Sequence, residues 1–159
     1  MDVLAIEATQ DEWCVERSDK DGKVLGTETG NLGVQNPTRL KDDKFIVVVW
    51  QSERVLDVVG RDCVREIAKT RAVIDLYQLA WLLVLAGVLK ERTLGGLAKW
   101  CNVSLQPEAS CGERCRAVAD CYRRLAYRAN LAFGIEDVGR GVATKVMDRA
   151  MEAVGKLVK

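Results

Sequence analysis

Two short apolar segments constrain the fold of this chain more than any other feature. Residues 3–8 are apolar apart from Glu7, and residues 45–50 form a continuous apolar run rich in β-branched side chains. Segments of this length and composition are typical of strands that are buried on both faces of a sheet. We therefore expect two central strands covered by helices, with Glu7 near the end of the first strand.

The segments around these strands predict a mixed sheet. Residues 12–17 alternate Trp13 and Val15 with charged neighbours, which is typical of a half-exposed strand. Asp21-Gly22 is a hairpin signal, and residues 23–29 form the predicted return strand. From residue 45 onward the pattern alternates strands with helices. The expected fold class is therefore α/β, with an antiparallel meander followed by β/α units and flanked by helices.

The later elements follow from apolar spacing and from capping residues. The sequence predicts a short strand over residues 72–74 and helices over residues 52–68, 76–90, 94–101 and 110–133. Residues 76–90 are apolar nearly all round the helix, so we expect this helix in the centre of the core. Ser110 and Glu113 have the spacing of a capping box, and Asp75 is interpreted as a helix N-cap.

Composition is that of an ordinary globular protein. The 159 residues are 48% hydrophobic and 30% charged, and the formal net charge is +1. We expect one domain over residues 1–138 and an amphipathic helix over residues 139–159, which packs on the domain or docks a protein partner or a second copy. Near-neutral charge gives no global attraction for nucleic acid, so such binding needs a local patch.

Features that direct a chain to a membrane or to secretion are not seen in the sequence. No signal-like segment is found at the start. The longest apolar run, residues 79–89, is too short to span a bilayer. We therefore expect a cytoplasmic protein without a membrane partner, whose six cysteines are reduced. The chain has no histidine, and its cysteine spacing does not indicate structural zinc.

Two acidic motifs lie near the ends of the predicted core. The first is Ala5-Ile6-Glu7-Ala8-Thr9, and the second is Cys115-Arg116-Ala117-Val118-Ala119-Asp120. Together with Ile74-Asp75-Leu76 and the helix that begins after Thr93, they resemble the ordered motifs of DEDD-type, proofreading-subunit-like 3′-5′ exonucleases. The resemblance covers most of residues 2–133. It implies a ribonuclease H-like fold and a site in which carboxylates hold Mg²⁺ or Mn²⁺.

The resemblance transfers only part of the family's site to this chain. Glu7 matches the family's glutamate and Asp120 its last aspartate, whereas Ala5 stands where the first aspartate is expected. The middle motif has a valine in place of its aspartate, so Asp57 is the nearest candidate, with Glu53 as the alternative. The implied metal ligands are therefore Glu7, Asp57 and Asp120, with Mg²⁺ or Mn²⁺ as the cofactor if a site survives.

Cys115 occupies the place of the family's catalytic histidine, which makes it the candidate catalytic residue. A free thiol has a pKa of about 8.5, and nearby carboxylates raise that pKa further. We therefore expect a poor proton acceptor at neutral pH. The alternative is that Cys115 is a small packing residue.

Three residues are candidate nucleic-acid contacts. Arg116 and Arg123 belong to a row of arginines on the predicted helix 110–133, and Trp50 lies at the end of a predicted strand, where it could cover the substrate entrance. The alternatives are that the charged helix face is only solvated, that Asp120 pairs with a neighbouring arginine, and that Trp50 belongs to the core.

These observations lead to three functional hypotheses. The first is an exonuclease-like protein with a degraded two-metal site, which has lost efficient catalysis and binds a nucleic acid 3′ end or a protein partner. The second is a divergent, active 3′-5′ exonuclease that acts on DNA or RNA. The third is a structural interaction protein without nuclease ancestry. We favour the first, because the first aspartate, the histidine and the middle motif all depart from the family pattern.

Overall fold

The computed structural model describes residues 2–33, 37, 45–60 and 73–133, with the side chains at 55–57, 59 and 128–133 left aside. Two predictions therefore lie outside the described residues. One is the continuation of the helix after residue 60 to residue 68, and the other is the amphipathic helix over residues 139–159.

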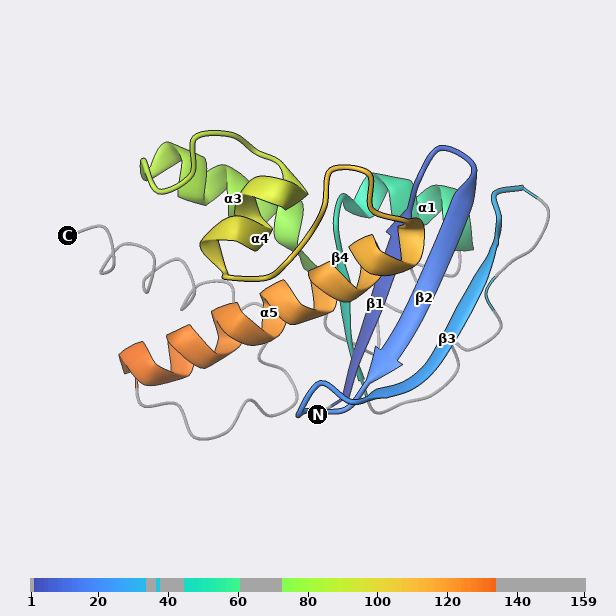
Figure 1. Cartoon of the computed structure of the whole chain (residues 1–159), viewed down its shortest axis with the longest axis horizontal. Coiled ribbons are helices and arrows are strands. Elements are labelled where there is room, and N and C mark those ends of the chain that lie inside the picture. Colours follow the sequence, from blue (N-terminus) through green and yellow to red (C-terminus); the bar gives the residue numbers. More distant parts are fainter. Residues whose placement is uncertain (1, 34–36, 38–44, 61–72, 134–159) are drawn as a thin grey trace.

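A five-stranded mixed sheet forms the centre of the described structure (Figure 1). Its order is β3-β2-β1-β4-β5. The strands are β1 (Asp2–Ala8), β2 (Glu12–Ser18), β3 (Val24–Asn31), β4 (Phe45–Val49) and β5 (Val73–Asp75). β1, β2 and β3 are antiparallel neighbours, whereas β1–β4 and β4–β5 pair in parallel. The α/β class and the mixed sheet are thus confirmed, and β1 and β4 are the fully buried strands that the sequence predicts.

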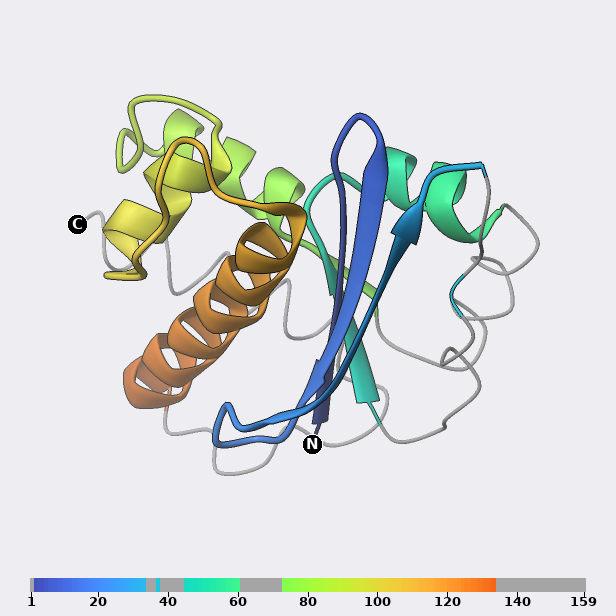
Figure 2. The same ribbon diagram turned by 45° about the vertical axis from the view of Figure 1, so that its right-hand side comes forward.

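Helices cover both faces of the sheet. They are α1 (Ser52–Val59), α3 (Leu76–Leu85), α4 (Leu94–Trp100) and α5 (Cys111–Phe133). The long helix α5 crosses β1 and β2, and α3 and α4 lie together beside it, as Figures 1 and 2 show. Val58 of α1 packs in a separate apolar cluster on the opposite face. The sheet is therefore the middle layer of three.

Alternation along β1 decides which residues meet which layer. Val3 and Ala5 belong to the cluster beneath α5, whereas Leu4, Ile6 and Ala8 belong to the cluster that contains α1. Glu7 has the same parity as Ala5 and therefore shares the α5 face. This parity makes position 7 a buried position under a helix.

Local capping signals set the starts of the helices. Asp75 is the N-cap of α3, and its side chain accepts a hydrogen bond from the Tyr77 amide. Ser110 and Glu113 form the predicted capping box, since each side chain accepts from the other's backbone N–H, at 3.2 Å and 2.7 Å. These predictions are confirmed because they depend on residues within one turn.

The prediction for residues 76–90 is wrong in two respects. α3 stops at Leu85, because Gly87 has a φ of 74° and the amides of Gly87 and Val88 bond back to the last turn of the helix. Its surface is also not buried all round: Trp81 is 44% exposed and Leu85 is 65% exposed. Apolar composition predicts that much of the helix surface is buried by other elements, but it does not identify which elements pack on which side.

In the described ranges, every helix is too short or too polar to cross a membrane.

Candidate functional site

The two sequence motifs meet where the start of α5 crosses β1. The Cys115 thiol donates to the carbonyl of Ala5, with 3.3 Å between sulfur and oxygen, and the Cys111 thiol donates to the carbonyl of Glu7 at 3.6 Å. α5 therefore runs antiparallel to β1, with Cys111 over position 7 and Cys115 over position 5. Ala5 and Cys115, the two positions at which the sequence departs from the exonuclease pattern that it resembles, are therefore in direct contact.

Glu7 lies in this contact zone and is fully buried. Its Oε1 atom accepts the Ala8 backbone N–H at 2.9 Å, and its Oε2 atom lies 3.4 Å from Nη2 of Arg114. Burial raises the pKa of the Glu7 carboxyl, while the charge of Arg114 and the Ala8 hydrogen bond act in the opposite direction. A guanidinium from α5 thus supplies positive charge beside the one acidic position that the first motif keeps.

Asp120 lies further along α5 and has a different partner. Its Oδ1 atom accepts from Nη1 of Arg123 at 2.8 Å, and the same guanidinium donates to the hydroxyl of Ser18. Ser18 pairs with Val3, four residues before Glu7 in β1. Four residues of strand span about 13 Å. The structure therefore does not bring Asp120 to Glu7.

The third predicted ligand, Asp57, is in α1, but its side chain lies outside the described residues. Its alternative, Glu53, is exposed in the first turn of the same helix. Within the described part of the chain, no group of three or more histidine, cysteine or acidic side chains could hold a metal ion.

The residues around Glu7 do not fit a two-metal centre. Such a centre needs several hard oxygen ligands around one point. Here the side chains that surround the carboxylate include Ala5, Cys14 and Cys115, which are all fully buried. The Arg114 guanidinium already places a positive charge beside Glu7, where a metal ion would bring its charge. The residue types at positions 5, 14, 114 and 115 are therefore the reason why this zone does not match the ligand set of a two-metal centre.

Cys115 is placed as a packing and hydrogen-bonding residue. Its sulfur lies 3.3 Å from the carbonyl oxygen of Ala5 and 3.5 Å from that of Cys14, so its single S–H is shared between these two acceptors. The hydrogen bond with the Cys14 thiol, together with burial, holds the pKa of Cys115 well above its ordinary value. This environment opposes the proton-accepting role of the family's histidine.

The arginines of α5 satisfy buried polar groups of the sheet. Three polar side chains are buried in the described residues: Glu7, Glu16 and Ser18. Each contacts an arginine of α5, and these are Arg114, Arg116 and Arg123 respectively. Arg116 and Arg123, predicted as nucleic-acid contacts, are therefore partly engaged within the molecule.

Sequence reasoning did not identify Arg114, Glu16 or Ser18. The antiparallel register places Glu7 opposite Cys14, Ala5 opposite Glu16 and Val3 opposite Ser18. Directly opposed residues share a face of the sheet. The sequence does show two acids in predicted strands followed by an arginine-rich helix, which is a signal for ion pairs between sheet and helix. Which arginine meets which acid depends on the strand register and on the position of α5.

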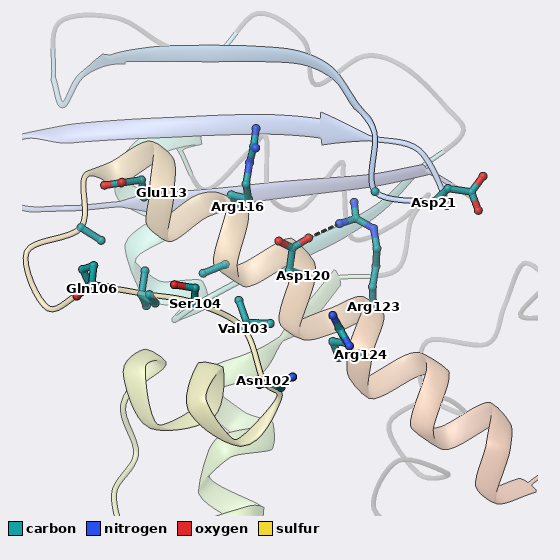
Figure 3. A pocket seen from close by; sticks show the side chains of 14 residues that line it. Asp21, Asn102, Val103, Ser104, Gln106, Glu113, Arg116, Asp120, Arg123 and Arg124 are labelled. Atoms are coloured by element: carbon teal, nitrogen blue, oxygen red, sulfur yellow. Dashed lines mark hydrogen bonds and ion pairs between the residues drawn. The ribbon is translucent and has the colours of Figure 1, made fainter.

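A groove of about 540 Å³ runs beside α5 (Figure 3). It is lined by the β2–β3 turn, the α4–α5 loop and the outer side of α5, including Arg116, Asp120, Arg123 and Arg124. Arg124 is exposed, and Nε of Arg123 is buried without a hydrogen-bond partner among the described residues. The groove therefore retains hydrogen-bond donors that internal ion pairs do not saturate.

Three acids also line the groove: Asp21, Glu113 and Asp120. Glu113 accepts the Ser110 amide, which holds the pKa of Glu113 below its ordinary value. Asp120 pairs with Arg123. The α4–α5 loop adds the polar side chains of Asn102, Ser104 and Gln106 (Figure 3). The groove thus combines arginines, acids and neutral polar groups, and the exposed Arg124 is the cation that can contact an anionic ligand.

Trp50 has a different place from the one predicted. It is 95% buried in the core and contacts Tyr77 edge to face, with ring centroids 5.4 Å apart. The Arg92 guanidinium covers the Tyr77 ring, 3.4 Å from its centroid. Trp50 follows the last residue of β4, and its burial leaves little of the side chain for contact with a nucleic-acid strand.

No family model matches the chain, and no curated protein or solved structure does.

Proposed function

We propose that this protein is an exonuclease-like chain of ribonuclease H-like fold that has lost two-metal catalysis and binds single-stranded nucleic acid without cutting it. The observation that carries the proposal is the contact zone of β1 and α5. There Ala5 and Cys115 pack together, and Arg114 neutralises the buried Glu7. A working two-metal site needs acids and a proton acceptor at these positions.

The order of the sheet supports the proposed ancestry. Three antiparallel strands lead into two parallel ones, in the order β3-β2-β1-β4-β5, with α5 across one face. This arrangement agrees with a ribonuclease H-like fold, in which the acidic strand β1 lies at the centre. Fold alone does not establish an activity, so the proposal depends on the residues of the contact zone.

The groove beside α5 supports binding of a phosphodiester strand. Arg124 is exposed and makes no ion pair in the described structure, and the Arg116 side chain is 58% exposed. Guanidinium groups pair well with phosphate oxygens. A formal net charge of +1 gives no long-range attraction, so affinity depends on these local contacts.

The experiment measures binding and cleavage on the same full chain. A 5′-labelled single-stranded oligonucleotide with a free 3′ end is titrated with protein by fluorescence anisotropy, with Mn²⁺ or with a chelator, and the length of the labelled strand is then checked by electrophoresis. We expect saturable binding that is independent of Mn²⁺ and no shortened product. Arg124→Gln should weaken binding several-fold and reduce its salt dependence by about one phosphate contact.

Lys90→Gln provides the matched control, because Lys90 is an exposed cation that does not line the groove. It should leave binding unchanged. If the labelled oligonucleotide becomes shorter only when Mn²⁺ is present, the result would support the active-exonuclease hypothesis instead. Failure to bind DNA or RNA strands would leave a protein partner as the ligand and contradict the proposal.

A further inference from the structure

Two cysteines that are distant in sequence form a buried pair between β2 and α5. The Cys115 thiol donates to the Cys14 carbonyl at 3.5 Å, across a sequence separation of 101 residues. Both side chains belong to the apolar cluster beneath α5. Cys14 lies opposite Glu7 on the face of the sheet that α5 covers. Both side chains are fully buried, so the pair belongs to the interface between helix and sheet.

The hydrogen bond makes the two thiols chemically unequal. The bond from Cys115 lowers the pKa of Cys14, against the effects of burial and of nearby Glu16 and Glu7. The same bond raises the pKa of Cys115. The thiolate is the nucleophile in disulfide exchange. In the closed structure Cys14 therefore has the greater thiolate character of the two.

We propose that Cys14 and Cys115 form a redox-active dithiol, which a small-molecule disulfide such as oxidised glutathione converts to a disulfide joining β2 to α5. The Cys14 thiolate attacks one glutathione sulfur, so that a mixed disulfide forms and glutathione thiolate leaves. The Cys115 thiol loses its proton, attacks the Cys14 sulfur and displaces the second glutathione. Two protein thiols are oxidised and one glutathione disulfide is reduced to two thiols.

Burial determines when this reaction occurs. The oxidant has no direct access while α5 covers Cys14, so exchange follows local opening of α5 from the sheet. After closure, the link joins two elements that lie 101 residues apart. A cross-link of that span restricts the unfolded chain and raises thermal stability. Oxidation thus fixes the helix that carries Arg114, Arg116 and Arg123.

The test uses the reduced full-length chain. The protein is incubated with oxidised glutathione, the remaining thiols are alkylated, and linked peptides are mapped by mass spectrometry. We expect a Cys14–Cys115 link and a melting temperature about 5–10 °C above that of the protein kept in dithiothreitol. Peptide mapping separates this link from any link between the other buried thiols Cys101 and Cys121.

Two variants make the result specific. Cys115→Ala removes the resolving thiol, so a glutathione adduct should persist on Cys14. Cys111→Ser is the matched control: Cys111 is another buried thiol of α5, but its hydrogen bonds go to the carbonyls of Glu7 and Glu12. It should leave the Cys14–Cys115 link intact.

Three outcomes would overturn the proposal. One is a stable glutathione adduct on Cys14 of the wild-type chain, and another is a link from Cys14 to Cys111 in place of Cys115. The third is the absence of reaction in mild urea, where opening is more frequent, while circular dichroism shows a folded protein. Because the readout is a covalent link, the result does not depend on nucleic-acid binding.

Discussion

Arg114 of α5 places its Nη2 atom 3.4 Å from Oε2 of Glu7 in β1, across 107 residues of sequence. The Glu7 side chain is fully buried, whereas the Arg114 side chain is 27% exposed to solvent. A buried carboxylate is tolerated only when hydrogen bonds and an opposite charge compensate for its lost hydration. This pair therefore fixes the position of α5 on the sheet and defines the chemistry of the contact zone.

Removal of the arginine should destabilise the fold. Arg114→Met keeps most of the side-chain volume but leaves Glu7 with one backbone hydrogen bond. We expect a loss of about 2–3 kcal/mol in the free energy of unfolding, with the smaller value favoured by the partial exposure of Arg114. Urea denaturation followed by circular dichroism measures the change.

Glu7→Gln is the informative comparison for that variant, because it removes the buried charge and keeps the shape. We expect its free energy of unfolding to lie within about 1 kcal/mol of the wild type. A double variant with Arg114→Met should recover most of the stability lost by Arg114→Met alone. A double variant as unstable as Arg114→Met alone would show that the arginine acts mainly through packing.

The pH dependence of stability should carry the signature of Glu7. Because the pKa of folded Glu7 is raised above 4.5, the folded state binds the proton more tightly than the unfolded state. Its contribution is fully present below pH 4.5 and is lost as the pH rises through the folded pKa. Wild-type stability should therefore fall with pH in this window relative to Glu7→Gln, as paired urea titrations from pH 4 to about 8 would measure.

Asp75 should be important for stability because it connects two helix starts. Its Oδ1 atom accepts from the amides of Tyr77 at 2.9 Å and Gln51 at 3.1 Å, and its Oδ2 atom accepts from the Ser52 amide at 2.8 Å. Asp75→Ala should cost about 2–3 kcal/mol, since three N–H donors lose their acceptor. Asp75→Asn keeps one acceptor oxygen, so thermal denaturation should show a smaller loss. Equal losses would contradict this explanation.

Gly30 should not tolerate a side chain. It pairs with Trp13 across β2 and β3, and an added Cβ atom would lie 2.4 Å from the indole. Trp13 is buried and cannot move without disturbing the core, so Gly30→Ala should cost about 1–3 kcal/mol.

Gly95→Ala is the control for the glycine substitution. Gly95 lies in α4, and nothing occupies the space around an added Cβ atom. This change should raise stability by about 0.5–1 kcal/mol, because alanine favours the helix. Thermal melts of the two variants should therefore shift in opposite directions.

Features that depend on neighbouring residues were predictable from the sequence. The buried strands β1 and β4, the Asp75 cap and the capping box at Ser110 all follow from short-range patterns. The stop of α3 at Leu85 also has a local cause, since Gly87 adopts a positive φ, but the apolar residues that follow concealed it. The exposure of Trp81 was not predictable, because it depends on which elements pack on α3.

The candidate site shows the same division. The sequence by itself determined the residue types at the two motifs, and therefore that neither Ala5 nor Cys115 supplies a carboxylate or an imidazole. Only the tertiary structure decided that Arg114 pairs with Glu7, that Asp120 pairs away from it and that Cys14 meets Cys115. Strand register and the position of a helix along the sheet fix such contacts, and both result from packing between residues that lie about a hundred positions apart.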